Sequence, residues 1–318
     1  MSVTINVVET VIAFSLLVVV TIILKKVDII KKEDSQTFSK LLTQVVLPAV
    51  IFSKLSTNPV KEDQFFLILA MIVAGTVSLL IAWAAGKILK LKRDVTGALM
   101  ISSAFGSSAL LGYPLIQFAF PGNQKAMTDA ILISELGVGL PIFTICPIIA
   151  LYFGNSSGNR NSLRDILLGY FRSPIFIAVV LGIIFSHFTI ASNNTFFATF
   201  FEAFRMLEGS LTILACLILG LQLNIRSLKG ILPLVIVSAV IQMVIQPFIA
   251  GFQANLYHLN AEQHQILILM SSLPSAVLGP VFATRFQCAS ETASSLVFIN
   301  IILSIIMIPL TFSTLMKF

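Results

Sequence analysis

The sequence has few charged side chains. Asp, Glu, Lys and Arg make up only 11% of its 318 residues, whereas a soluble domain carries about 25%. So few charges cannot cover a solvated surface, and most of the outer surface must therefore face lipid. This scarcity excludes a cytosolic enzyme, a nucleic-acid-binding module and a disordered chain, even though the formal net charge is +6.

Other absences exclude further kinds of site. The three cysteines, Cys146, Cys216 and Cys288, are odd in number and lie in or beside apolar segments, so we expect neither disulfides nor a metal site. No nucleotide-binding loop is found, which leaves ion or substrate gradients as the energy source. No Lys or Arg precedes the first apolar run, so we expect that run to be a membrane span and not a cleaved signal peptide. We expect no enzymatic activity and no cofactor.

What the sequence does contain is long apolar runs. Hydrophobic residues make up 57% of the chain, and the mean hydropathy is +0.99. A membrane helix needs about 20 mainly apolar residues, and no segment alternates like the strand of a membrane barrel. We therefore predict an all-α polytopic membrane protein with ten transmembrane helices. These lie near 5–24, 38–55, 65–86, 96–118, 126–151, 166–187, 206–224, 231–256, 264–285 and 292–316.

The positions of the positive charges predict the orientation in the membrane. Fifteen of the 20 Lys and Arg residues lie on the face that holds the loops after spans 1, 3, 5, 7 and 9. Lys and Arg accumulate in cytoplasmic loops. We therefore expect a multi-pass protein of the cell (plasma) membrane, with both termini outside the cytoplasm.

The two halves of the sequence resemble each other. Ser108–Gly112 reads SALLG and Ser275–Gly279 reads SAVLG, 167 residues later. The same offset moves spans 1, 2, 3 and 5 onto spans 6, 7, 8 and 10. We predict two five-helix repeats, 1–151 and 166–318, joined by a polar cytoplasmic linker over 152–165. An odd number of spans in each repeat inverts the second one, which is typical of secondary transporters.

Spans 4 and 9 contain helix-breaking residues near their midpoints, where glycine and proline weaken or interrupt a helix. Each could be an ordinary proline kink, but breaks at equivalent positions of two inverted repeats favour a binding site made by two crossing, interrupted helices. The N-termini of half-helices attract an anion without a buried Lys or Arg. The candidate substrate-binding residues are Gly106, Ser107, Ser108, Gly112, Pro114, Pro274, Ser275, Ala276 and Gly279.

Glu135 is the carboxylate that lies well inside a predicted span. A charged group at that depth is costly and is often functional, so Glu135 is the candidate for proton coupling. The alternative is a shallower position or a neutral, hydrogen-bonded helix contact. Gln242 and Gln246 in span 8 are expected to form hydrogen bonds between helices.

Charged residues also occur at the ends of two predicted spans. Glu202, Arg205 and Glu208 are spaced by three residues and are expected to pair with one another at the start of a helix. Lys54 ends the second span, and we expect its long side chain to reach the membrane surface.

Several of these motifs resemble one family. The sequence of 106–114 resembles the fourth-helix motif of auxin efflux carriers, which include plant PIN proteins and bacterial malate or malonate permeases. Residues 47–55 with Asn58-Pro59 are similar to the second helix of that family, and Leu273-Pro274 with Val281–Ala283 to its ninth. The likeness covers essentially the whole chain.

The resemblance implies an architecture and a class of substrate. It implies ten helices, a scaffold of helices 1, 2, 6 and 7, a transport domain of the others, elevator-type alternating access, a homodimer formed through the scaffold, and organic anion substrates. The chain departs from the family at Ser107, where Asn is usual, and over 69–77, which is apolar where plant members carry an Asp and a Lys. Auxin itself is therefore not the expected substrate.

Taken together, the sequence predicts a secondary active transporter of a small organic anion, a carboxylate such as malate or malonate, in which a proton or sodium gradient drives transport. The alternative is a sodium-coupled symporter or a cation/proton antiporter of a related crossed-helix fold. The expected partners are the substrate anion, the coupling ion, the lipid bilayer and a second copy of the chain. Nucleic acid is not among them.

Overall fold

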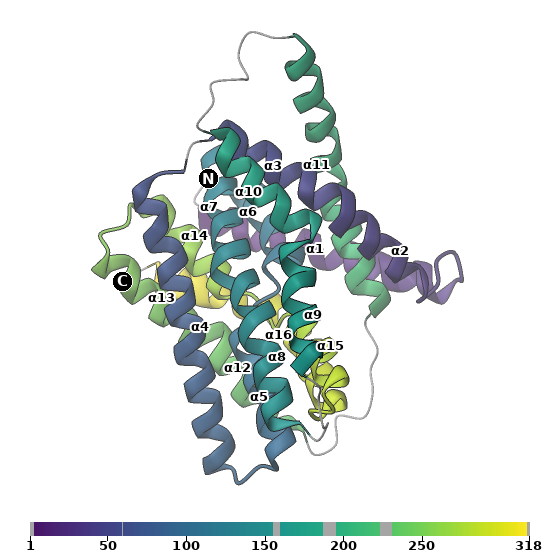
Figure 1. Ribbon diagram of the computed structural model, residues 1–318, viewed down its shortest axis with the longest axis vertical. Helices are drawn as coiled ribbons and strands as arrows, with labels where there is room; N and C mark the ends of the chain where they lie inside the picture. Colours follow the sequence, from purple (N-terminus) through teal and green to yellow (C-terminus); the bar gives the residue numbers. More distant parts are fainter. Residues whose placement is uncertain (1–2, 59, 155–159, 187–194, 223–230, 317–318) are drawn as a thin grey trace. The chain divides into compact units, whose positions relative to one another are not determined.

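The computed structural model describes residues 3–58, 60–154, 160–186, 195–222 and 231–316, and every named element in these ranges is a helix (Figure 1). The centre of the predicted linker, 155–159, lies outside the described residues. The α-helices and four π-helical segments (η) are α1 (Val3–Lys26), α2 (Asp34–Leu41), η1 (Leu42–Val46), α3 (Leu47–Thr57), α4 (Glu62–Ile88), α5 (Arg93–Ala104), η2 (Ser108–Gly112), α6 (Tyr113–Ala119), α7 (Gln124–Leu132), η3 (Ile133–Gly139), α8 (Leu140–Phe153), α9 (Arg160–Phe171), α10 (Pro174–Ser186), α11 (Thr195–Gln222), α12 (Leu232–Val240), η4 (Ile241–Ile245), α13 (Gln246–Leu256), α14 (Ala261–Ser271), α15 (Leu278–Arg285) and α16 (Ser290–Leu315).

Seven continuous helical stretches among the described residues are long and apolar enough to cross a membrane. They are Thr4–Lys26, Asp34–Thr57, Glu62–Ile88, Gln124–Phe153, Thr199–Leu221, Leu232–Leu256 and Ser290–Leu315. Leu163–Phe171 and Pro174–Ser186 together make an eighth. The prediction of an all-α, multi-pass membrane protein is therefore confirmed. The other two predicted spans, 96–118 and 264–285, are each divided into shorter helices.

Four prolines determine where the helices widen into π-helical turns. Pro48, Pro114, Pro141 and Pro247 each lie two residues after the end of a π segment. Proline cannot donate a backbone hydrogen bond and clashes with the carbonyl one turn earlier, and a π turn accommodates the displaced carbonyls. At three of these sites the backbone N–H of the residue before the proline donates to the carbonyl oxygen five residues earlier, as Leu140 N does to Glu135 O.

The contacts divide the chain into two compact units. Unit 1 comprises Met1–Glu62, Ala109–Ile131 and Tyr170–Asn224. In it α1 packs against α6 and α11, and α3 packs against α10 and α11. Phe52 of α3 is central to this packing. The centre of its ring lies 5.5, 6.3 and 6.1 Å from the ring centres of Phe185, Phe201 and Phe204, respectively.

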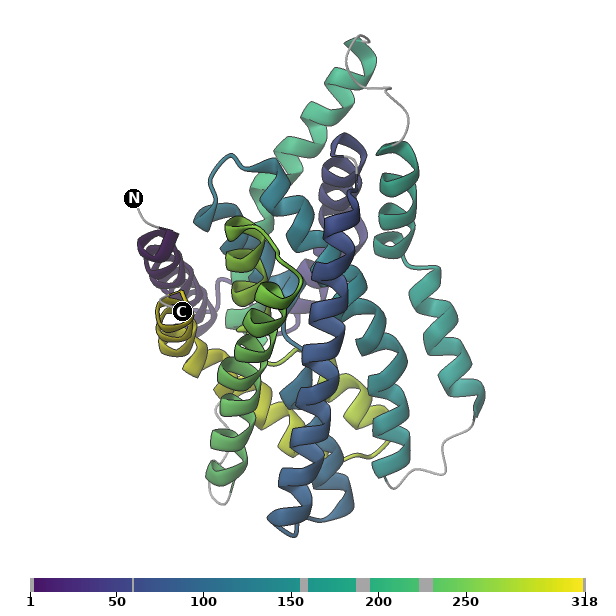
Figure 2. The same cartoon turned by 90° about the vertical axis from the view of Figure 1, so that its left-hand side faces the viewer.

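Unit 2 comprises Asp63–Ser108, Leu132–Gly169 and Ile225–Phe318. In it α5 packs against α8 and α16, α13 against α14, and α15 against α16 and α8; Figure 2 gives a second view of these helices. Helix faces that are not packed expose large apolar side chains, such as Phe252 at 65% and Ile306 at 69%. Such surfaces suit contact with lipid acyl chains.

Candidate functional site

Two short stretches of unit 2 leave the helical conformation. α5 ends at Ala104 and η2 begins at Ser108, and the intervening Phe105 has extended φ and ψ values of −118° and 119°. α14 ends at Ser271 and α15 begins at Leu278. Gly106 in the first stretch and Pro274 in the second are the residue types that interrupt helices.

The two stretches pair with each other through their main chains. Ser107 N donates to Pro274 O at 2.8 Å, and Ala276 N donates to Phe105 O at 2.7 Å. Gly106 and Ser275 form an antiparallel bridge between these two bonds. The pairing satisfies backbone groups that the helix breaks release, which a low-dielectric environment requires.

Gly106 allows this close approach. A Cβ atom at this position would lie 3.3 Å from the Cβ of Leu273 and 3.5 Å from its carbonyl oxygen. That separation is tight, so a larger side chain would push the two stretches apart.

The pairing brings together six of the nine predicted substrate-binding residues. Gly279 lies just beyond them and donates from its backbone N to Ala276 O at 3.1 Å. Gly112 and Pro114 belong to unit 1. The six that meet in unit 2 are Gly106, Ser107, Ser108, Pro274, Ser275 and Ala276, and all of them are buried.

Buried polar residues from distant parts of the sequence surround the paired stretches. Ser275 Oγ and Ser238 Oγ both donate to Ser102 O, the second at 3.3 Å. Asn300 Nδ2 donates to Ser238 Oγ at 2.8 Å and to Ser275 Oγ at 2.7 Å. The sequence alone gave Ser102, Ser238 and Asn300 no binding role, because nothing local marks them as neighbours of span 9.

Of the two span-8 glutamines, Gln246 forms the predicted hydrogen bond between helices, whereas Gln242 bonds to Gln246 in its own helix. Gln246 Nε2 donates to Ala104 O, the last residue of α5, at 3.3 Å. Gln242 Nε2 donates to Gln246 Oε1 at 3.0 Å. Both side chains are fully buried, and Gln246 connects the η4–α13 helix to α5 at the point where α5 ends.

Glu135 lies in η3 and is also buried, with 6% of its surface exposed. One residue, Ser134, connects its carboxylate to the paired stretches. Ser134 Oγ lies 3.1 Å from Glu135 Oε1 and 2.9 Å from Ser108 Oγ, the first residue of η2. A short polar path therefore connects the predicted proton carrier with the predicted substrate residues.

Comparison with known proteins places this architecture in a family. The family described as "Membrane transport protein" matches residues 6–312, almost the whole chain. The chain belongs to the membrane transport protein family. This is the auxin efflux carrier family that the sequence motifs resemble, and the prediction of that family is confirmed.

Proteins of several other organisms are similar to this chain along most of its length. An "Uncharacterized transporter" of Methanothermobacter thermautotrophicus is 26% identical over 304 residues, which is 95% of this chain and 96% of that protein. A second uncharacterized transporter, from Methanocaldococcus jannaschii, is 25% identical to this chain, and the match covers 95% of this chain and 96% of that protein. The "Uncharacterized transporter YfdV" of Escherichia coli is 21% identical over 88% of each chain. All three are named as transporters and none as an enzyme.

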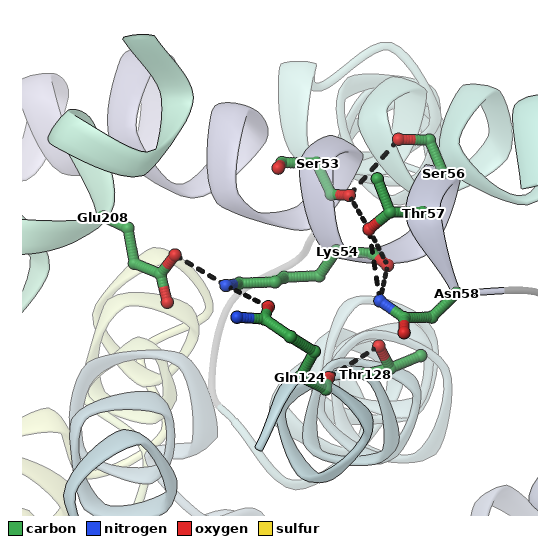
Figure 3. Close-up of polar contacts among 8 residues, drawn as sticks. All are labelled: Ser53, Lys54, Ser56, Thr57, Asn58, Gln124, Thr128 and Glu208. Carbon is green, nitrogen blue, oxygen red and sulfur yellow. Dashed lines mark hydrogen bonds and ion pairs between the residues drawn. The ribbon is translucent and has the colours of Figure 1, made fainter. Parts of the chain in front are cut away.

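This member of the membrane transport protein family also has a buried charge cluster in unit 1 (Figure 3). Lys54 Nζ of α3 lies 2.7 Å from Glu208 Oε2 of α11, and it donates to Gln124 Oε1, at the start of α7, at 2.6 Å. Its side chain is only 8% exposed. A pocket of about 270 Å³ lies beside the pair, and its lining includes Gln117 and Arg205.

The cluster corrects two expectations. Lys54 does not extend to the surface, because Glu208 supplies a buried counter-charge. Glu208 is not part of a triad with its neighbours. Within the described part of the chain Arg205 pairs with Glu202 and not with Glu208, at 2.6 Å and in an exposed position. The partner of each residue could not be read from the sequence, because Lys54 and Glu208 lie in different helices.

Proposed function

We propose that this protein is a secondary active transporter of a small organic anion, a carboxylate such as malate or malonate. The observation that carries the proposal is the main-chain pairing of two helix-free stretches within one compact unit of a transporter-family protein. Hydroxyl groups of Ser107 and Ser108 lie there, next to the first N–H groups of η2. N-terminal N–H groups of helices bind anions without a buried cation.

We further propose that the chain has ten spans arranged as two inverted repeats. The seven continuous spans, the α9–α10 pair and the two interrupted spans give the required number. Ser107 and Pro274 are 167 residues apart, so they are equivalent positions in the two repeats, and they are hydrogen-bonded to each other. Equivalent residues can meet in this way only near a pseudo-two-fold axis, which supports the repeat.

Elevator-type movement is part of the same proposal. The resemblance implies a scaffold of helices 1, 2, 6 and 7, and unit 1 contains the corresponding segments α1, α2–α3, α10 and α11. It also contains α6 and most of α7, whereas most of α9 belongs to unit 2. Unit 2 contains the paired stretches. We propose that unit 2 carries the substrate, and that unit 1 serves as the scaffold through which two copies of the chain form a dimer.

Glu135 is the proposed proton carrier. Its contact with Ser134, which also contacts Ser108, connects protonation of the carboxylate to the start of η2. A proton that binds Glu135 would remove its negative charge before a substrate anion approaches, and so would favour binding of that anion.

The proposal is tested by counterflow in proteoliposomes. Vesicles loaded with unlabelled malate or malonate are given the labelled anion outside, with and without a pH gradient. The parent protein should accumulate label, and Ser107→Ala should lose most of this activity while Ser294→Ala, an exposed serine of α16, should retain it. Glu135→Gln should transport without a response to pH. Folded parent protein that exchanges no carboxylate would refute the assignment of the substrate.

A further inference from the structure

A first chain of hydrogen bonds orients the amide of Asn300. Ser102 O accepts hydrogen bonds from the hydroxyls of Ser275 and Ser238. Each hydroxyl thereby uses its one proton and can only accept from any further partner. Asn300 Nδ2 supplies both of these bonds. The nitrogen of the amide must therefore face the two serines, and Asn300 Oδ1 faces away from them.

A second series of hydrogen bonds orients the amide of Gln242, again with its nitrogen toward the bonded partners. A main-chain carbonyl only accepts hydrogen bonds, so Ala104 O fixes Gln246 with its nitrogen toward α5. Gln246 Oε1 then accepts from Gln242 Nε2. Gln242 Oε1 is consequently the last atom of this hydrogen-bonded series, and it faces away from Gln246.

Both terminal amide oxygens are buried without a hydrogen-bond donor. Gln242 Oε1 and Asn300 Oδ1 have no partner among the described residues, and the same holds for the hydroxyls of Ser102 and Ser103. All four residues have 0% exposure. A buried oxygen without a donor loses the hydrogen bonds that it makes in water, and native proteins normally satisfy such groups with a bound water or ion.

Ser102, Gln242 and Asn300 lie around one bridge, and Ser103 follows Ser102 in α5. Gln242 Nε2 lies 3.5 Å from the position that a Cβ of Gly106 would occupy, and Asn300 is bonded to Ser275. Gly106 and Ser275 are the bridged pair. The two amides thus approach the same pair of residues from η4 and from α16, within unit 2.

We propose that Gln242 Oε1, Asn300 Oδ1 and the hydroxyls of Ser102 and Ser103 bind a sodium ion. The donors are hard, neutral oxygens, whereas calcium and magnesium sites are built around carboxylates. α5 ends at this site, and the C-terminal end of a helix carries partial negative charge that favours a cation. The inference rests on the proposed function for the role of the ion, which is to couple anion transport to a sodium gradient.

The sodium site is separate from Glu135. None of its four side chains changes its protonation state near neutral pH. Sodium binding should therefore persist in Glu135→Gln, which distinguishes this site from the proposed proton carrier.

The test measures the ion without any substrate. The purified full-length protein is titrated with ²²Na⁺, and its thermal unfolding is followed in sodium, potassium or choline chloride at constant ionic strength. Sodium should bind saturably and raise Tm. Gln242→Met and Asn300→Ala should each raise the sodium Kd by roughly tenfold or more, the equivalent of losing about 1.4 kcal/mol.

Gln253→Met is the matched control. Gln253 is a buried glutamine of α13 that donates to Ala70 O at 3.1 Å, away from the bridge, and this variant should keep the sodium affinity of the parent. Folded parent protein that binds no ²²Na⁺ would overturn the inference, and so would equal stabilisation by potassium. Because no carboxylate is present, these results are independent of whether malate or malonate is transported.

Discussion

At the scale of single residues, Lys54 shows how a charge is retained in the interior of unit 1. Its ammonium group contacts Glu208 and Gln124, and the side chains of the ion pair are 8% and 13% exposed. The main chain around it is also well bonded, since Asn58 Nδ2 donates to Lys54 O at 2.8 Å. Removal of either partner would leave a buried charge without compensation, which is strongly destabilising.

Glu208→Gln should therefore lower the free energy of unfolding by about 3 kcal/mol, whereas Lys54→Met/Glu208→Met should cost less than the sum of its two single variants. Thermal unfolding of the purified proteins provides the measurement. Glu202→Gln breaks the ion pair with Arg205, in which the side chains of Arg205 and Glu202 are 74% and 44% exposed. It should change the free energy of unfolding by about 0.5 kcal/mol at most. Equal effects of Glu202→Gln and Glu208→Gln would show that burial does not strengthen the pair.

The residues that sequence reasoning found and missed differ in one physical respect. Gly106 and Pro274 disturb the helix at their own positions, so their effect is visible locally. Asn300 and Ser238 act only through partners at 275 and 102, and hydropathy reports how apolar a segment is but not which segments meet. Lys54 was misread for the same reason, because its counter-charge lies in another helix.

At the scale of helices, Gly154 is required where α8 ends. A Cβ on this residue would lie 2.1 Å from Phe286 O and 2.6 Å from Ala150 O, both main-chain atoms. Main-chain atoms cannot rotate away as the end of a side chain can. The end of α8 is thereby held against the residues that follow α15.

Gly154→Ala should lower the stability of the protein by about 1–3 kcal/mol through overpacking. Gly169→Ala is the control, because a Cβ there meets no atom within 4 Å, and alanine is the better helix former. Unfolding temperatures of the two variants give the comparison. If Gly154→Ala unfolded at the temperature of the parent, the close approach to Phe286 would not constrain the structure.

The sequence predicted where the helices lie better than it predicted where they widen into π turns. The apolar runs located the continuous spans closely, because length and hydropathy are properties of one segment. The π turns before Pro48, Pro141 and Pro247 were not predicted. A proline can be accommodated by a kink, a break or a π turn, and surrounding packing selects among them.

At the scale of the whole molecule, the positive charges of the loops remain the basis for its orientation. The excess of Lys and Arg after the odd-numbered spans predicts that the α4–α5 turn is cytoplasmic and that the α13–α14 turn is on the opposite side. Leu89, 43% exposed, and Ala261, also exposed, are suitable reporters in these turns. The native cysteines are buried, so they should give little background labelling.

A membrane-impermeant maleimide should label Ala261→Cys in intact cells and Leu89→Cys only after the membrane is permeabilised. The opposite pattern would reverse the orientation of the whole chain, because every span is fixed once one loop is located. Labelling of both variants in intact cells would mean that one of the two turns is not where the ten-span arrangement puts it.

The pairing at Gly106 and Ser275 has a consequence for how proteins of this architecture can evolve. Only two backbone N–H groups, those of Ser107 and Ala276, donate across the pairing, so proline is the one residue type that these two positions exclude on hydrogen-bonding grounds. At these two positions the support depends on the main chain, so their side chains can be exchanged while the support remains. Divergent members of the family can thus vary the residues at Ser107 and Ala276 and keep the same pairing of the two stretches.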